Sequence, residues 1–124
     1  MATDHPADAF IAFAHATEID RSDPVLWDRM GTAAYHSGDR TLAIDAYRRA
    51  TQTDSAYAPA WSHLGDALSD TGMYNEAIAS FDRALSIKTQ LKTAWAGKSL
   101  AYTRMGNFEL ADYAARQALA LPPA

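Results

Sequence analysis

The sequence predicts an all-α protein built from one repeated pair of helices. Three tryptophans, Trp27, Trp61 and Trp95, follow one another at a spacing of 34 residues. Small residues follow each of them at the same four distances: Gly31, Gly65 and Ser99 after four residues, Gly38, Gly72 and Gly106 after eleven, Ala43, Ala77 and Ala111 after sixteen, and Ala50, Ala84 and Ala118 after twenty-three. Between them, apolar residues recur every three or four positions, as on an amphipathic helix. Arrays of this kind generally bind other molecules and do not catalyse reactions.

The composition is that of a globular protein with one modest core. The chain has 124 residues, of which 48% are hydrophobic and 21% charged. Its formal net charge of −4 disfavours nucleic acid as a partner, because nucleic-acid binding usually needs a basic stripe. The absence of cysteine excludes disulfides and thiol catalysis. No apolar run is long enough for membrane insertion, and the polar start of the chain lacks a secretory signal, so a cytoplasmic location is the default expectation.

The first expected element is a single helix without a partner. Ala9, Phe13 and Ala16 stand 34 residues before the matching second-helix positions of the first full repeat. Residues 8–19 are therefore expected to form the second helix of a half-repeat that caps the array. This half-repeat occupies residues 1–23, and three full repeats occupy residues 24–124. The prediction is thus seven helices in one domain.

The first full repeat is expected over residues 24–57. Asp23 is a suitable N-cap, and Pro24 suits the first helical turn, where its missing N–H is not needed. The first helix is therefore expected over about 24–37. Gly38 then supplies a left-handed turn, and the second helix follows over about 40–53.

The second and third repeats are expected over about 58–91 and 92–124. In the second repeat, Ser55 and Pro59 precede the tryptophan, Gly72 marks the turn, and the second helix is expected over about 74–87. In the third, Gly106 marks the turn and the second helix is expected over about 108–120. Residues 88–91 contain neither Asp nor Pro, so the start of the third repeat is the least clearly marked boundary.

Small residues are needed where the two helices of a repeat approach closely. Gly65 and Ala77 fit this requirement, because a large side chain there would hold the helix axes apart. Phe81 is then expected to fill the wedge between neighbouring repeats. The regular spacing accounts for the aromatic residues as core, and they are not interpreted as a cofactor site.

The eight residues from Trp61 to Leu68 have the pattern W-x2-L-G-x2-L. Together with Gly72, Ala77 and Phe81 downstream, this pattern resembles the tetratricopeptide repeat. The resemblance covers about residues 24–121. It implies a right-handed superhelix of antiparallel helix pairs, in which the first helices line a concave groove that holds an extended peptide or a partner helix.

The chain departs from the family pattern at several positions. In the third repeat Lys98 and Ala115 replace larger apolar residues, so this repeat is expected to be loosely packed, with the Lys98 ammonium extending outward. Some members bind carboxylate-ended chaperone tails with paired Lys and Asn. Asp28 and Thr32 stand at the first of those positions, and no first helix contains Asn. Chaperone-tail binding is therefore disfavoured.

The residues expected to line the groove lie one, five, eight and nine positions after each tryptophan, along one helical stripe. They are Asp28, Thr32, Tyr35 and His36 in the first repeat, Ser62, Asp66, Ser69 and Asp70 in the second, and Ala96, Leu100, Thr103 and Arg104 in the third. Three acids fall in the first two repeats, and an apolar patch with one arginine in the third. This favours a protein or peptide ligand with basic or hydroxyl groups at one end and an apolar contact at the other. Alternatively, these are ordinary solvated positions.

No arrangement of residues points to catalysis, and no cofactor is expected. His63 and Asp66 lie three apart on a helix and could share a metal ion, but a second pair of ligands is absent, so no metal site is predicted. No nucleophile with its base, phosphate-binding loop or dinucleotide motif is present. The leading interpretation is a non-enzymatic protein-interaction module.

The last helix suggests a second function. Tyr113, Leu119 and Leu121 remain apolar at positions where a terminal face would be exposed. Such a face favours self-association into a homo-oligomer, although a monomer or a piece of a longer protein would also be consistent. The alternatives to groove binding are therefore a scaffold that assembles through its terminal helix faces, or an accessory repeat domain of a larger enzyme, secretion protein or regulatory protein.

Overall fold

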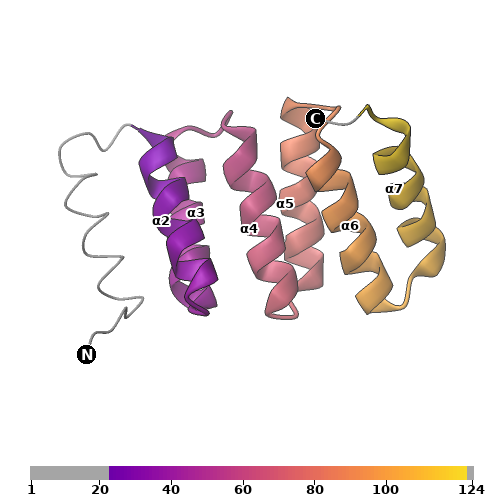
Figure 1. Ribbon diagram of the computed structural model, residues 1–124, viewed down its shortest axis with the longest axis horizontal. Helices are drawn as coiled ribbons and strands as arrows, with labels where there is room; N and C mark the ends of the chain where they lie inside the picture. Colours follow the sequence, from indigo (N-terminus) through magenta and orange to yellow (C-terminus); the bar gives the residue numbers. More distant parts are fainter. Residues whose placement is uncertain (1–22, 123–124) are drawn as a thin grey trace.

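The computed structural model describes residues 23–122, and all of its regular structure is helical (Figure 1). The helices are α2 (Pro24–His36), α3 (Arg40–Thr53), α4 (Ala58–Asp70), α5 (Tyr74–Ile87), α6 (Lys92–Met105) and α7 (Phe108–Ala120). This confirms the predicted all-α array. The helix expected over residues 8–19 lies outside the described part of the chain. None of these six helices is both long and apolar enough to cross a membrane.

Some of the helices have an N-cap residue whose side chain accepts a hydrogen bond from the first turn, and others do not. The Asp23 carboxylate accepts a hydrogen bond from the backbone N–H of Val25 at 2.9 Å, as its N-cap position predicts. Asp39 caps α3 in the same way. Helices α4, α5 and α6 begin after Tyr57, Met73 and Leu91 without a side-chain cap.

The turns within the pairs depend on glycine. Gly38, Gly72 and Gly106 each follow the first helix of a repeat with φ between 85° and 89°. This left-handed conformation is unfavourable for residues with a Cβ atom. The glycine eleven residues after each tryptophan is therefore what reverses the chain between antiparallel helices.

The first helices of the repeats form the inner face of the stack. Helices α2, α4 and α6 lie side by side in front of α3 and α5 (Figure 1), and α4 has close backbone contacts with both α2 and α6. No close backbone contacts join α3 to α5 or α5 to α7. The first helices of neighbouring repeats are therefore closer together than the second helices. The row of helix pairs curves toward the closer side, so α2, α4 and α6 line the concave face.

The core depends on aromatic rings placed against glycines. A Cβ atom added to Gly31 would lie 2.6 Å from the Tyr47 ring, and one added to Gly65 would lie 2.6 Å from the Phe81 ring. A Cβ atom on Gly97 of the next repeat would lie 2.3 Å from the same Phe81 ring. Phe81 is fully buried, and it fills the wedge between the second and third repeats as predicted.

The third repeat packs with smaller side chains. Ser99 and Ala115 stand where the earlier repeats have a glycine and an aromatic residue, and the Ser99 hydroxyl donates to the carbonyl oxygen of Ala111 at 2.9 Å. Helix α6 has three buried residues, whereas α4 has eight. The expectation that Lys98 extends outward is wrong, because its side chain is only 14% exposed and its ammonium lies 2.7 Å from the Asp82 carboxylate.

Trp61 and Trp95 join the second and third repeats to the loops before them. The Trp61 indole donates to the carbonyl oxygen of Ser55 at 2.9 Å, and the Trp95 indole donates to that of Thr89 at 3.2 Å. Both rings are partly exposed, and the Arg83 guanidinium covers the Trp61 ring at 4.8 Å. The two indoles therefore bridge the surface between repeats and do not lie fully within the core.

Candidate functional site

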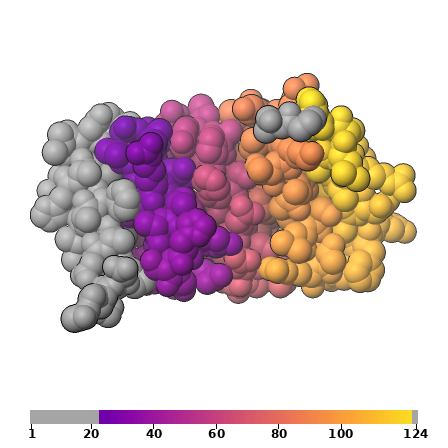
Figure 2. Space-filling model, in the orientation of Figure 1, coloured from indigo at the N-terminus to yellow at the C-terminus, as the bar shows by residue number. Residues whose placement is uncertain are grey.

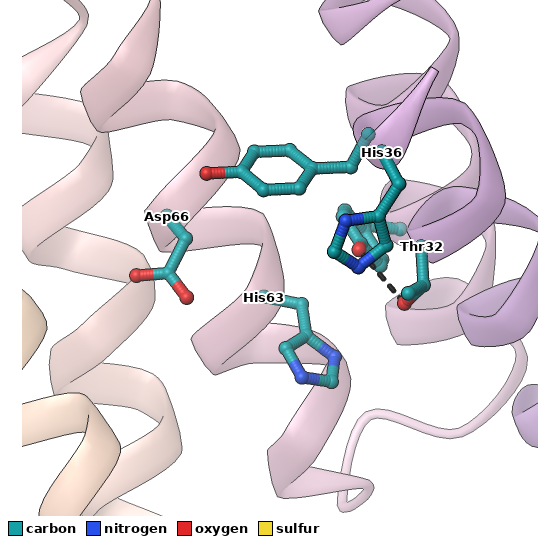
Figure 3. Close-up of a pocket in the computed structure, with 6 residues that line it drawn as sticks. Thr32, His36, His63 and Asp66 are labelled. Atoms are coloured by element: carbon teal, nitrogen blue, oxygen red, sulfur yellow. Dashed lines mark hydrogen bonds between the residues drawn. The ribbon is translucent and has the colours of Figure 1, made fainter. Parts of the chain in front are cut away.

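A small hollow opens on the concave face between α2 and α4 (Figure 3). Its volume is about 130 Å³. Asp66 and His63 project from α4 on one side, and His36 and Thr32 from α2 on the other. The residues that line it are Thr32, Tyr35, His36, Tyr47, His63 and Asp66. Four of these six were predicted to line the groove, whereas Tyr47 and His63 were not.

Tyr47 of α3 forms the base of the hollow. Its side chain is almost completely buried, and its hydroxyl lies 3.0 Å from the Thr32 hydroxyl, within hydrogen-bond distance. Burial raises the pKa of the Tyr47 phenol to about 12, so the group stays neutral near physiological pH. The second repeat has Phe81 at the matching position, so this hydroxyl is peculiar to the first repeat.

His63 is held across two repeats. Its Nδ1 atom donates to the Asp28 carboxylate at 2.8 Å, and its ring lies against the Tyr47 ring with centroids 5.5 Å apart. The hydrogen bond to Asp28 raises the pKa of His63, although burial acts in the opposite direction. Asp28 is buried and already has a partner, so it does not present a free charge to the groove.

Asp70 joins all three repeats. Its carboxylate accepts a hydrogen bond from the Tyr35 hydroxyl of the first repeat and from Arg104 of the third at 3.3 Å. Arg40 lies 3.6 Å from the same carboxylate. The hydrogen bond to Asp70 is the main reason that the pKa of Tyr35 rises to about 12. Arg104 of the third repeat therefore forms an ion pair with Asp70 of the second repeat. The predicted separation of acidic residues at one end of the groove from arginine at the other is wrong.

Asp66 is the exception among these acids. In the part of the chain that the structure describes, no hydrogen bond or ion pair satisfies its carboxylate. Burial raises the pKa of Asp66 to about 6, and the neighbouring charge of Asp70 acts in the same direction, whereas His63 lowers it. The hollow therefore contains one partly desolvated carboxylate without a counter-charge.

The other predicted groove residues divide into two groups. Ser62 and Ser69 are buried, and neither hydroxyl has a hydrogen-bond partner among the described residues. They do not present a surface to the groove, because α2, α4 and α6 pack side by side and cover the flanks of α4. In contrast, the four positions of the third repeat are exposed: Ala96, Leu100, Thr103 and Arg104.

Helix α7 forms one end of the described stack (Figure 2). Leu119 is 78% exposed, whereas Leu85, at the same position of the second repeat, is 8% exposed. Tyr113 is also exposed, although its ring contacts Trp95 with centroids 6.1 Å apart, and Leu121 is partly buried. Phe108, which was not among the predicted self-association residues, is exposed as well. An apolar surface thus remains where an inner repeat would contact its neighbour.

These features define a class of protein. A stack of antiparallel helix pairs with a concave inner face is an α-solenoid, and such proteins generally act as protein-interaction modules. Residues 58–90 and 93–124, just over half of the chain, each match the sequence profile of the tetratricopeptide repeat. The chain belongs to the tetratricopeptide repeat family, as the resemblance predicted.

Solved structures of the same architecture agree with this assignment. A crystal structure of MamA is 27% identical with a TM-score of 0.82, covering 92% of this chain and 67% of that one. A second structure of MamA is also 27% identical, with a TM-score of 0.81, and 62% of it is covered, so this chain spans about two thirds of the MamA chains. The TPR domain of Arabidopsis OM64 is 21% identical with a TM-score of 0.78, covering 81% of this chain and 83% of that one. A search of curated proteins found no match.

Proposed function

We propose that the protein is a non-enzymatic interaction module that binds an extended protein segment along α2, α4 and α6. The observation that supports this most directly is the hollow on the concave face, which is lined by polar side chains of two first helices and contains an unpaired carboxylate. Further along the same face, Leu100 of α6 is 47% exposed. A ligand that follows this face therefore meets a polar hollow and then an apolar contact.

Leu100 allows this proposal to be tested outside the hollow. The change Leu100→Glu places a charge on the concave face at a half-exposed position, so it should weaken binding at least tenfold while changing stability by less than about 0.5 kcal/mol. Proteins captured from cells that express the protein would be identified by mass spectrometry, and their affinities measured by calorimetry. The matched control is Ile87→Glu, a partly exposed position at the end of α5. Equal affinity of Leu100→Glu and wild type would disprove binding along the groove.

The α7 face supports a second candidate function, assembly with another copy of the chain. In the inner repeats, the position of Leu119 is covered by the first helix of the following repeat, as the burial of Leu85 demonstrates. Among the described first helices, α4 and α6 already pack against the second helix of the preceding repeat, so α2 is the helix that a second copy would supply.

The change Leu119→Glu should abolish any self-association without weakening the fold, because this side chain is 78% exposed. Sedimentation velocity over a range of protein concentrations would measure the effect. A wild-type protein that stays monomeric at concentrations of about 100 μM, well above the micromolar range of ordinary association, would contradict assembly through this face.

A further inference from the structure

We infer that the hollow between α2 and α4 holds a basic side chain, a lysine or an arginine, of the bound protein, with its cation against the Asp66 carboxylate. This inference rests on the proposed function, since it assigns the chemistry of one subsite in the groove. The inference is based on two features of the hollow: Asp66 has no counter-charge among the described residues, and the walls and volume suit a long basic side chain.

The other acids of the concave face already have counter-charges or donors. Asp28 accepts a hydrogen bond from His63 at 2.8 Å, and Asp70 is shared by Tyr35, Arg40 and Arg104. Both arginines close to this part of the groove therefore contact Asp70, and neither lies within ion-pair distance of Asp66. A carboxylate that is partly desolvated and has no partner is expensive to maintain. A cation supplied by a ligand removes that cost.

The walls of the hollow also suit a cation on an alkyl stem. The rings of Tyr35, Tyr47 and His63 line it, and the faces of aromatic rings attract cations within about 6 Å. The hydroxyls of Tyr35 and Tyr47 are already engaged with Asp70 and Thr32, so the rings are fixed in place before a ligand arrives. Protonation of His63 adds little repulsion, because its charge is matched by Asp28.

Other occupants fit less well. An anion would be repelled by Asp66, and a neutral alkyl group would leave the partly desolvated carboxylate without a partner. A metal ion needs several ligating groups, and among residues 23–122 no three such side chains come together. The volume of about 130 Å³ matches the end of one long side chain, equal to roughly four water molecules.

The probe for this subsite is n-butylammonium, which has the stem and charge of a lysine side chain. Titration of ¹⁵N-labelled full-length protein, followed by NMR, should give saturable shifts at His63, Asp66 and Tyr47 with a Kd on the order of 1–10 mM. A parallel titration with n-propylguanidinium tests the arginine side chain, and n-butanol is the uncharged control. Equal binding of n-butanol, or no saturable shift with either cation, would overturn the inference.

Two carboxylate variants locate the effect. Asp66→Asn keeps the shape and removes the charge, so it should weaken n-butylammonium binding at least tenfold. Asp45→Asn removes a half-exposed carboxylate from α3 and should leave binding unchanged. If the shifts persist in Asp66→Asn, the cation binds elsewhere and the assignment is wrong. The groove proposal is tested separately at Leu100, so failure of this subsite can be distinguished from failure of groove binding.

Lowering the pH should weaken binding, because a proton competes with the cation for Asp66. With the pKa of Asp66 raised to about 6, affinity should fall roughly tenfold between about pH 7.5 and pH 5. The same titration in Asp66→Asn should be nearly flat. Protonation of His63 should contribute little to this change, because Asp28 matches the charge of His63. The ionisable side chains that face Asp66 from its own and neighbouring helices are His63, Asp70, Tyr35, His36, Tyr47 and Arg104.

Discussion

Truncation of Phe81 to alanine should lower the free energy of unfolding by about 3–5 kcal/mol. The ring is fully buried, and it packs against Gly65 on one side and Gly97 on the other. Neither glycine has a side chain that could move into the space, so the cavity should remain largely open. For a small repeat protein, this loss is a large part of the total stability.

Urea unfolding followed by circular dichroism would measure this change. The matched control is Phe108→Ala, which truncates the same residue type at a position 68% exposed and should cost less than about 1 kcal/mol. Similar losses in the two variants would contradict the central role of the Phe81 contact.

Gly97→Ala gives a sharper form of the same prediction. In the wild type, its Cβ atom would lie 2.3 Å from the Phe81 ring, so the change should destabilise the protein. In the Phe81→Ala background the obstacle is gone, and the higher helix propensity of alanine should then stabilise it by up to about 1 kcal/mol. The sign of the effect should therefore reverse, which measures the coupling between the two residues directly.

The repeat pattern predicted much of the fold because the residues that shape it act locally. The second helices predicted over 40–53, 74–87 and 108–120 have those bounds in the structure. Turn glycines such as Gly38 require a backbone conformation that other residues avoid, so their spacing marks the ends of the helices. Phe81 was also predicted correctly, since its spacing placed it between two apolar stripes.

The candidate site was only partly predictable, because its contacts join residues about 35 positions apart. The pairs Asp28–His63 and Tyr35–Asp70 each link one repeat to the next, and a pattern within one repeat does not contain them. The same limit applies to Gly97, which is needed because the Phe81 ring of the preceding repeat packs against it. The polar residue types predicted by the spacing indicated a binding surface. The hydrogen bonds between repeats, which the spacing does not predict, leave Asp66 as the carboxylate without a partner among the described groove residues.

Replacement of Asp66 by asparagine should stabilise the protein by about 1–3 kcal/mol near neutral pH. The pKa of Asp66 is raised to about 6 from its ordinary value of 3.8, and a tenfold change in proton affinity corresponds to about 1.4 kcal/mol. The folded protein therefore binds this proton more tightly than the unfolded chain, so ionisation of Asp66 disfavours the fold. Asparagine has a similar shape and no charge, and it removes this penalty.

The pH dependence identifies the cause of the gain. Below about pH 3 the carboxyl is protonated in both folded and unfolded chains, so Asp66→Asn should give no advantage there. The advantage should grow as the pH rises from about 4 to 6 and remain constant above that range. Asp45→Asn, whose carboxylate is half exposed and 3.5 Å from Arg49, should change stability by less than about 0.5 kcal/mol at every pH. A gain that is independent of pH would instead point to packing.

A carboxylate that weakens the fold is informative about the groove, because a ligand that neutralises it should recover the lost stability. Saturating n-butylammonium should therefore raise the melting temperature of the wild type more than that of Asp66→Asn. If both proteins respond equally, the stability effect at Asp66 is separate from binding. A response confined to the wild type would connect the two properties, since the charge that lowers stability in the free protein would be the group that the basic side chain contacts.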